Sequence, residues 1–350
     1  RGLEIVREAA GAERFLLGCG CPLGPAIGLV DAMRVSTDVA LDWRPHQGAL
    51  SPLLRGEPVY PAAANALRNS LTRAWTHRTL WLNDPDALVL RQGGSRLTGA
   101  EVRTLATVAA LSGGTWMLGD DLPGLEAGRQ PLAAVGLPVH AGRPWVPDLL
   151  AREQPREFVL ELERSWGQGW LVALINWEDR PAGLEFDLAA LGLPPDRRCH
   201  LHEFWGSEYR RVQGRVRFAG VEPHGCRTFL VRPVQDEPQW VGSTLHIVQG
   251  EEVGAWAGRP TGASLTLDAG RAAAGSLLLW LPGVASPRVS IRRKGVEASL
   301  EPVEEGVWRV RLRAGEAGSF QVRVAKDQPG STDGVSRAGE RARRSSAASR

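Results

Sequence analysis

The chain has 350 residues, and its 42 basic and 39 acidic residues leave a formal net charge of +3. So small an excess excludes the extended basic footprint with which many proteins hold nucleic acid. Every apolar run is far shorter than the ~20 residues that cross a bilayer as a helix, so no membrane-spanning helix is predicted. The 4 cysteines form no disulfide framework, which favours a reducing compartment, and we expect a cytoplasmic protein.

The amino-terminal segment predicts a helix followed by a buried strand. Residues 2–10 place Leu3, Val6 and Ala9 on one side of a helix, and residues 15–20 are an apolar run that ends in glycine. Glycine at a strand end permits a tight turn and a close approach to a ligand. The chain begins with arginine, and we expect it to be the carboxyl-terminal piece of a longer protein.

Three further predicted strands carry acidic residues at their carboxyl ends. Residues 33–38 end at Asp38, residues 77–91 run into an Asn-Asp-Pro-Asp turn at 83–86, and residues 115–121 end in two aspartates. In a (β/α)8 barrel the carboxyl ends of the parallel strands meet at one face, where catalytic groups gather. We therefore expect these strand ends to converge on one pocket.

Helical segments of suitable length separate these strands. Residues 62–75 have helical apolar spacing, Thr98 opens a capping box with Glu101, and Gly113 provides a stop after the second helix. Parallel strands need such crossovers. Because a closed barrel needs eight strands, the predicted fold class is α/β plus all-β, with residues 1–150 as the carboxyl-terminal half of a barrel.

Beyond residue 150 the pattern changes to short alternating strands separated by Gly, Pro and Asp. Runs at 157–163, 169–176 and 227–232 predict an antiparallel β-sandwich over residues 151–235. Further alternating runs predict an accessory β-rich domain over residues 236–325, with scaffold favoured over a sugar-binding module. Residues 326–350 have almost no apolar content, so we expect a disordered tail.

At the strand ends the chain resembles the melibiase-type α-galactosidases, and most closely glycoside hydrolase family 36. Four segments carry this resemblance in the order that the family has: Phe15–Leu23, Val30–Asp38, Leu80–Asp86 and Leu111–Asp121. The resemblance implies retaining, double-displacement hydrolysis of terminal α-galactosides, with an α-galactoside oligosaccharide as substrate. It implies no metal or organic cofactor and is compatible with a homo-oligomer. The small net charge and the short apolar runs, in turn, predict no nucleic-acid partner and no membrane partner.

The same resemblance assigns roles to individual residues. Its Arg-x-x-x-Asp element maps onto Arg34 and Asp38, which makes Asp38 the general acid/base and Arg34 a substrate contact. A retaining glycosidase also needs a nucleophilic carboxylate. The family's Lys-x-Asp nucleophile motif has no counterpart here, so we expect this chain to be inactive alone. The structural alternative for Asp38 is a helix cap.

Three more residues are predicted to contact the substrate. Cys19 is interpreted as a pocket wall, because a Cys-x-Cys spacing suits neither zinc nor a disulfide. Trp43 is the tryptophan nearest to the acid/base loop, although most of the 13 tryptophans are expected in the core. Asp86 is a candidate whose alternative is an Asx turn that binds only backbone.

Other functions remain open at this point. A transglycosylase, or another α-glycosidase of the same clan, would use the same covalent intermediate with a different acceptor or sugar. A non-catalytic carbohydrate-binding remnant is a second class. It is disfavoured physically, because an open half barrel would expose sheet edges and an apolar lining.

Overall fold

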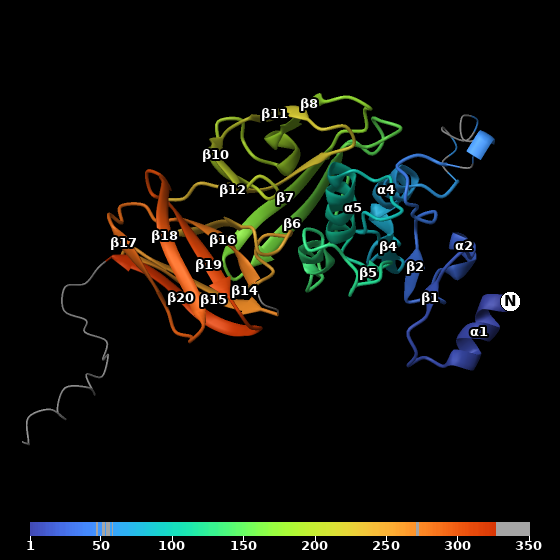
Figure 1. The fold of residues 1–350 in the computed structure, drawn as a ribbon, viewed down its shortest axis with the longest axis horizontal. Coiled ribbons are helices and arrows are strands. Elements are labelled where there is room, and N and C mark those ends of the chain that lie inside the picture. The colour runs from blue at the N-terminus through green and yellow to red at the C-terminus, as the bar shows by residue number, and fades with distance from the viewer. Residues whose placement is uncertain (47, 51–52, 54–56, 58, 271–272, 327–350) are drawn as a thin grey trace, which may run out of the picture.

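The computed structural model describes residues 1–46, 48–50, 53, 57, 59–270 and 273–326 (Figure 1). The predicted tail over 326–350 lies outside the described residues except for Lys326, which ends the last strand. Across the described ranges, no helix is both long enough and apolar enough to cross a membrane. Most of the regular structure is antiparallel β-sheet, and the helices are concentrated before residue 150.

Short parallel strands and helices make up the amino-terminal unit. Parallel pairing joins β1 to β2 and β2 to β3, and a separate parallel pair joins β4 to β5. The elements are α1 (Gly2–Ala10), β1 (Leu17–Gly18), α2 (Leu23–Ala26), β2 (Ala32–Arg34), η1 (Gly48–Leu50), α4 (Ala63–Thr72), η2 (Ala74–Thr76), β3 (Leu82–Asp84), β4 (Ala87–Leu88), α5 (Gly99–Ser112), β5 (Met117–Leu118) and η3 (Gln130–Ala134).

The predicted helix boundaries are confirmed where capping signals define them. Thr98 accepts a hydrogen bond from the backbone of Glu101, whose side chain accepts one from the Thr98 backbone, so α5 begins with a complete capping box. Gly113 ends α5 with a φ of 67°, a left-handed conformation that glycine adopts without strain. Nearly all of α5 is buried, which makes it the central helix of this unit.

The parallel strands are shorter than the sequence predicts. The strand expected at 33–38 ends at Arg34, because the Ser36 hydroxyl bonds to the Pro85 carbonyl and the Thr37 hydroxyl to the Val59 carbonyl. The strand expected within 77–91 is divided into β3 and β4 by Asp86, whose φ is 82°. Apolar content predicted the strands, but turn contacts from other segments determine their ends.

A second unit, which follows the connection near residue 150, is an antiparallel sandwich. One sheet has the order β10-β9-β12-β7-β6, and β11 pairs with β8 in the other. A core between them includes Val172, Phe186, Leu201 and Phe229. The elements are β6 (Glu157–Arg164), β7 (Gly167–Ile175), β8 (Ala182–Asp187), η4 (Leu188–Leu191), β9 (Cys199–Glu203), β10 (Glu208–Val212), β11 (Arg215–Val221) and β12 (Cys226–Pro233).

Two four-stranded antiparallel sheets form the third unit, in the orders β13-β16-β19-β18 and β14-β15-β20-β17. Their inner faces alternate apolar residues such as Leu265, Val322 and Leu277 with outward polar ones. The strands are β13 (Gln239–Ser243), β14 (Val253–Arg259), β15 (Gly262–Ala269), β16 (Ala273–Trp280), β17 (Pro287–Ile291), β18 (Val296–Glu304), β19 (Val307–Ala314) and β20 (Gly318–Lys326).

The three units follow one another along the long axis of the molecule and are joined by buried apolar residues (Figure 1). One hydrophobic cluster includes Leu105 of the first unit, Leu160 and Leu230 of the second, and Leu277 and Val322 of the third. Because these side chains form one contiguous cluster, the units pack directly on one another.

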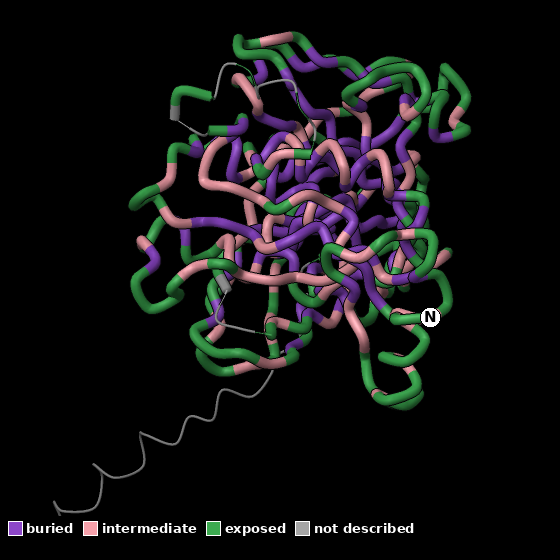
Figure 2. The backbone as a smooth tube through the Cα atoms, turned by 90° about the vertical axis from the view of Figure 1, so that its right-hand side faces the viewer, coloured by how far each residue is buried: buried purple, intermediate pink, exposed green. Residues whose placement is uncertain are grey.

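The amino-terminal edge differs from this packed interior. None of the residues of α1 is buried, and Ile5, Val6, Phe15 and Ile27 are 50–60% exposed. Figure 2 colours most of this edge as exposed, in contrast to the buried interior beside it. In the described sheet, β1 is an edge strand that pairs only with β2. Apolar surface and an open sheet edge therefore lie side by side here.

A buried acid in the third unit gives the first prediction. Glu252 is 6% exposed, it accepts hydrogen bonds from Ser243 and the Gly250 backbone, and burial raises its pKa from 4.5 to about 7. Its contribution to stability is full below pH 4.5 and is lost as pH rises through about 7. Glu252→Gln carries no such titration. We therefore expect the free energy of unfolding of the variant, relative to that of the parent, to rise by ~2 kcal/mol from pH 5 to pH 8.

Urea unfolding of both proteins at the two pH values measures this difference. The control is Glu297→Gln, which removes an exposed acid of the same unit. A stability difference between parent and Glu252→Gln that does not change with pH would contradict the assignment.

Candidate functional site

Arg34, the last residue of β2, joins three carboxylates at the strand ends. Its side chain is only 14% exposed, and its Nε atom donates to Asp84 Oδ2 at 2.9 Å. Its Nη1 atom lies 2.9 Å from Asp86 Oδ2 and 3.4 Å from Asp38 Oδ1. Burial alone would lower the pKa of Arg34, but the hydrogen bond to Asp84 and the charges of Asp84 and Asp86 raise it. Arg34 is therefore a fixed cation.

Two of these carboxylates are also held by other groups. Asp84 is fully buried, and its Oδ1 accepts from the Asp86 backbone at 2.9 Å and from the Thr115 hydroxyl at 2.7 Å. Asp86 accepts from the backbone N–H of Val39 at 2.7 Å and of Ala87 at 2.6 Å. These contacts tie the ends of β2 and β3 to the segment before β5.

Asp38 differs from both, since its side chain is 74% exposed. Within the described part of the chain, the one side-chain contact recorded for its carboxylate is the 3.4 Å contact with Arg34. Its backbone carbonyl accepts from Ala62 at the start of α4, so the main chain at Asp38 is anchored while the carboxylate faces solvent. Of the three carboxylates, Asp38 is the one accessible to a ligand.

Cys19 lies on the strand end next to Arg34. It is exposed, and electrostatic interaction with Cys19 is among the influences that raise the pKa of Arg34. Cys21, in contrast, contacts the Met33 sulfur at 3.8 Å. All four cysteines are free thiols. The structure thus brings Cys19 together with Arg34, Asp38 and Asp86, four of the five residues predicted for the site.

Trp43, the fifth predicted residue, lies elsewhere. It is 7% exposed and stacks on His224, with ring centroids 4.4 Å apart and an interplanar angle of 12°. Its ring is also tilted against Trp177 at 5.8 Å. A cleft between the first two units is lined by Trp43, Arg44, Arg68 and Trp177 among others. Burial of both tryptophans leaves little ring surface for stacking on a sugar.

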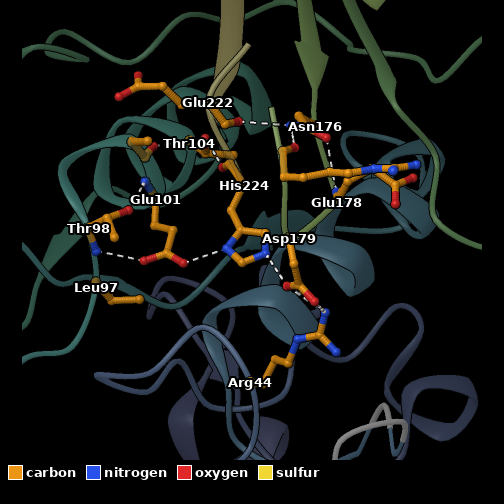
Figure 3. Close-up of polar contacts among 12 residues, drawn as sticks. Arg44, Leu97, Thr98, Glu101, Thr104, Asn176, Glu178, Asp179, Glu222 and His224 are labelled. Carbon is orange, nitrogen blue, oxygen red and sulfur yellow. Dashed lines mark hydrogen bonds and ion pairs between the residues drawn. The ribbon is translucent and has the colours of Figure 1, made fainter. Parts of the chain in front are cut away.

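His224, on which Trp43 stacks, is also part of a polar junction between the first two units. Figure 3 shows its imidazole between Glu101 and Asp179. His224 Nδ1 lies 2.6 Å from Glu101 Oε1, and its Nε2 lies 2.9 Å from Asp179 Oδ1. Asp179 in turn accepts two hydrogen bonds from Arg44, at 2.7 and 2.8 Å. Both imidazole nitrogens donate to carboxylates only when the ring carries two protons. His224 therefore links Glu101 of the first unit to Asp179 of the second.

The environment of Glu101 agrees with this arrangement. Burial alone would raise the pKa of Glu101, but hydrogen bonds from His224 and Thr98 lower it below 4.5. Glu101 thus serves the α5 capping box and the junction at the same time. The sequence predicted the capping box, whereas His224 is 123 residues away from Glu101 and no local pattern connects them.

No metal centre is apparent among the described residues, because they contain no group of three or more His, Cys, Asp or Glu placed to hold an ion. The carboxylates that converge at the strand ends share Arg34 as their cation. Chemically, the arrangement offers one accessible carboxylate beside a buried, permanently charged guanidinium.

No protein-family model matches the chain. A GH27 β-L-arabinopyranosidase from Geobacillus stearothermophilus is similar in fold, with a TM-score of 0.50 and 17% identity over 66% of this chain and 53% of that chain. α-Galactosidase I from Mortierella vinacea has a TM-score of 0.44 and 15% identity, over 59% of this chain and 54% of that chain. An α-galactosidase from Thermus thermophilus has a TM-score of 0.35 and 27% identity, over 45% of this chain and 30% of that chain. The chain spans about half the length of the first two.

These three similar structures are glycoside hydrolases, and two of them are α-galactosidases. At these identities the likeness is one of fold. The antiparallel sheets after residue 150 agree with the β-sandwich part of such enzymes.

The unequal burial of the carboxylates predicts unequal effects on stability. Arg34→Met leaves Asp84 and Asp86 buried without their cation, and we expect a loss of about 3–5 kcal/mol. Asp38→Asn removes only an exposed pair, and we expect a change below about 1 kcal/mol. Urea unfolding of both variants tests this difference. Equal losses would show that Arg34 does not hold the buried pair.

The junction predicts a second stability effect. His224→Gln cannot donate to Glu101 and Asp179 at once, and we expect a loss of about 1.5–3 kcal/mol at pH 6. Because ionised Glu101 accepts the hydrogen bond and its pKa is lowered, this loss should shrink as pH falls below 4.5. The control is Glu222→Gln, which removes an exposed pair with Arg103. A loss independent of pH would show that ionised Glu101 is not the acceptor in this contact.

Proposed function

We propose that the chain is part of a retaining glycoside hydrolase of the α-galactosidase type, and that Asp38 is its general acid/base. The observation that carries the proposal is the accessible Asp38 carboxylate beside the buried Arg34, at the carboxyl ends of parallel strands. Catalytic groups lie at that face in parallel barrels. The fold shared with a GH27 glycosidase supports the same class.

In the proposed reaction Asp38 first protonates the leaving glycosidic oxygen and later removes a proton from the attacking water. Its exposure leaves the carboxylate accessible to both the leaving group and water. Arg34 stays protonated throughout, and its guanidinium interacts with the Asp38 carboxylate at 3.4 Å. Asp84 and Asp86 hold Arg34, and we assign them a positioning role in which Asp86 also borders the sugar.

The proposal places the nucleophile on a strand that this chain does not include. The exposed apolar residues of α1 and the open edge of β1 are surfaces that further barrel strands and helices would cover. We infer that residues 1–150 form half of a (β/α)8 barrel, related to glycoside hydrolase family 36, and that terminal α-galactosides are the substrate. A nucleophilic aspartate would then approach the sugar from the missing half.

A comparison of two proteins tests this function: the present chain and a form extended upstream in its gene. We expect hydrolysis of an aryl α-galactoside by the extended form alone, with retention of anomeric configuration. An extension without a strand-end aspartate, or an extended form without activity on any α-glycoside, would contradict the proposal.

The role of Asp38 is tested by substrates with different leaving groups. In the extended form, Asp38→Ala should slow hydrolysis of an oligosaccharide by about 100-fold or more, because its leaving oxygen needs a proton. A substrate with an acidic phenol as leaving group should lose far less in its first chemical step. Asp120→Ala is a useful comparison, since Asp120 accepts from the Leu90 backbone rather than facing solvent. Equal losses on both substrates would exclude Asp38 as the acid.

A further inference from the structure

The sheet β14-β15-β20-β17 of the third unit has a polar outer face. Cross-strand pairing aligns Ala257, Ser264, Arg323 and Ser290 in one row. Residues within a strand that share a face lie two positions apart, about 7 Å. The rows on either side add further polar residues to the same face. One row contains Arg259, and the other contains Gln321 with the adjoining Arg292.

This face is hollowed into a groove of about 400 Å³. Small residues, among them Ala257, Gly262 and Ser264, are part of its lining. Arg259, Arg292 and Arg323 line it, together with hydroxyl and amide side chains, and none of its lining residues is acidic. The groove is therefore positively charged and rich in hydrogen-bonding groups.

The three arginines are exposed, and no ion pair or hydrogen bond of their side chains is recorded within the described ranges. The opposite sheet of the same unit differs in this respect. There Arg309 and Arg311 both pair with Glu301, at 3.3 and 2.8 Å. An arginine fork forms strong bidentate contacts with carboxylates. Among the residues that the structure describes, no carboxylate takes up this capacity of the three groove arginines, so they can bind an external ligand.

We propose that this groove binds an anionic polysaccharide whose sugars carry carboxylates. The arginines lie in successive rows along the groove rather than around one point, which fits repeated negative charges better than a single small anion. Ser264, Ser290 and Gln321 lie between them and suit sugar hydroxyls. No aromatic side chain lines the groove, and nucleic-acid single strands are generally held by such side chains.

The sequence after Lys326 is an unsuitable occupant by charge. Residues 327–350 contain five arginines against three acidic residues, so they would be repelled by the groove. The proposed ligand is external, and its binding does not depend on Asp38 or on catalysis. Failure of this inference would leave the proposed glycosidase function untouched, and the converse also holds.

Isothermal titration of the full chain with polygalacturonate oligomers at low salt tests the proposal, with neutral β-galactan oligomers as the uncharged comparison. We expect binding of the acidic oligomer that weakens as salt is added. Arg323→Ala should weaken this binding about tenfold, and Arg259→Ala combined with Arg292→Ala should weaken it further. The matched control is Arg313→Ala, an exposed arginine on the opposite sheet, which should bind as the parent does.

Several outcomes would overturn the inference. These are equal binding of neutral and acidic oligomers, equal weakening by Arg313→Ala and Arg323→Ala, and full competition by millimolar inorganic phosphate. Tighter binding of a single-stranded oligonucleotide than of the acidic oligomer would also overturn it. Circular dichroism of each variant establishes that loss of binding does not result from unfolding.

Discussion

The ion pairs of Arg34 with Asp84 and Asp86 are the constraint on which the candidate site depends. Both carboxylates are at least nine-tenths buried, and a buried charge is costly unless a partner compensates it. Arg34 supplies that partner, and backbone N–H groups and the Thr115 hydroxyl complete the hydrogen bonding. The geometry of two strand ends follows from this network. The same guanidinium also lies beside Asp38, which has no comparable support and remains exposed.

The site is supported in turn by the way that the first two units meet. The loop after Asp38 runs into Trp43 and Arg44, and these side chains contact His224 and Asp179 of the sandwich. The position of that loop is thus fixed from both sides, by α4 through the backbone and by the sandwich through aromatic and ionic contacts. The sandwich is therefore part of what positions the loop after Asp38.

The sequence was informative where local chemistry decides structure. The capping box of α5, the stop at Gly113 and the alternating strands after residue 150 could all be predicted, because each depends on neighbouring residues. Strand ends were predicted less well, since contacts such as Ser36 to Pro85 come from distant segments. The junction at His224 could not be foreseen, and neither could the burial of Trp43 beneath it. Motif spacing brought Arg34 and Asp38 together but did not distinguish a held carboxylate from an accessible one.

We propose that the accessible Asp38 activates water in a retaining glycosidase. Azide tests this role, because the anion attacks a glycosyl-enzyme without the help of a base. In the extended form carrying Asp38→Ala, with an activated aryl α-galactoside, we expect azide to accelerate turnover and yield α-galactosyl azide. Turnover that azide leaves unchanged, with galactose as the sole product, would contradict it.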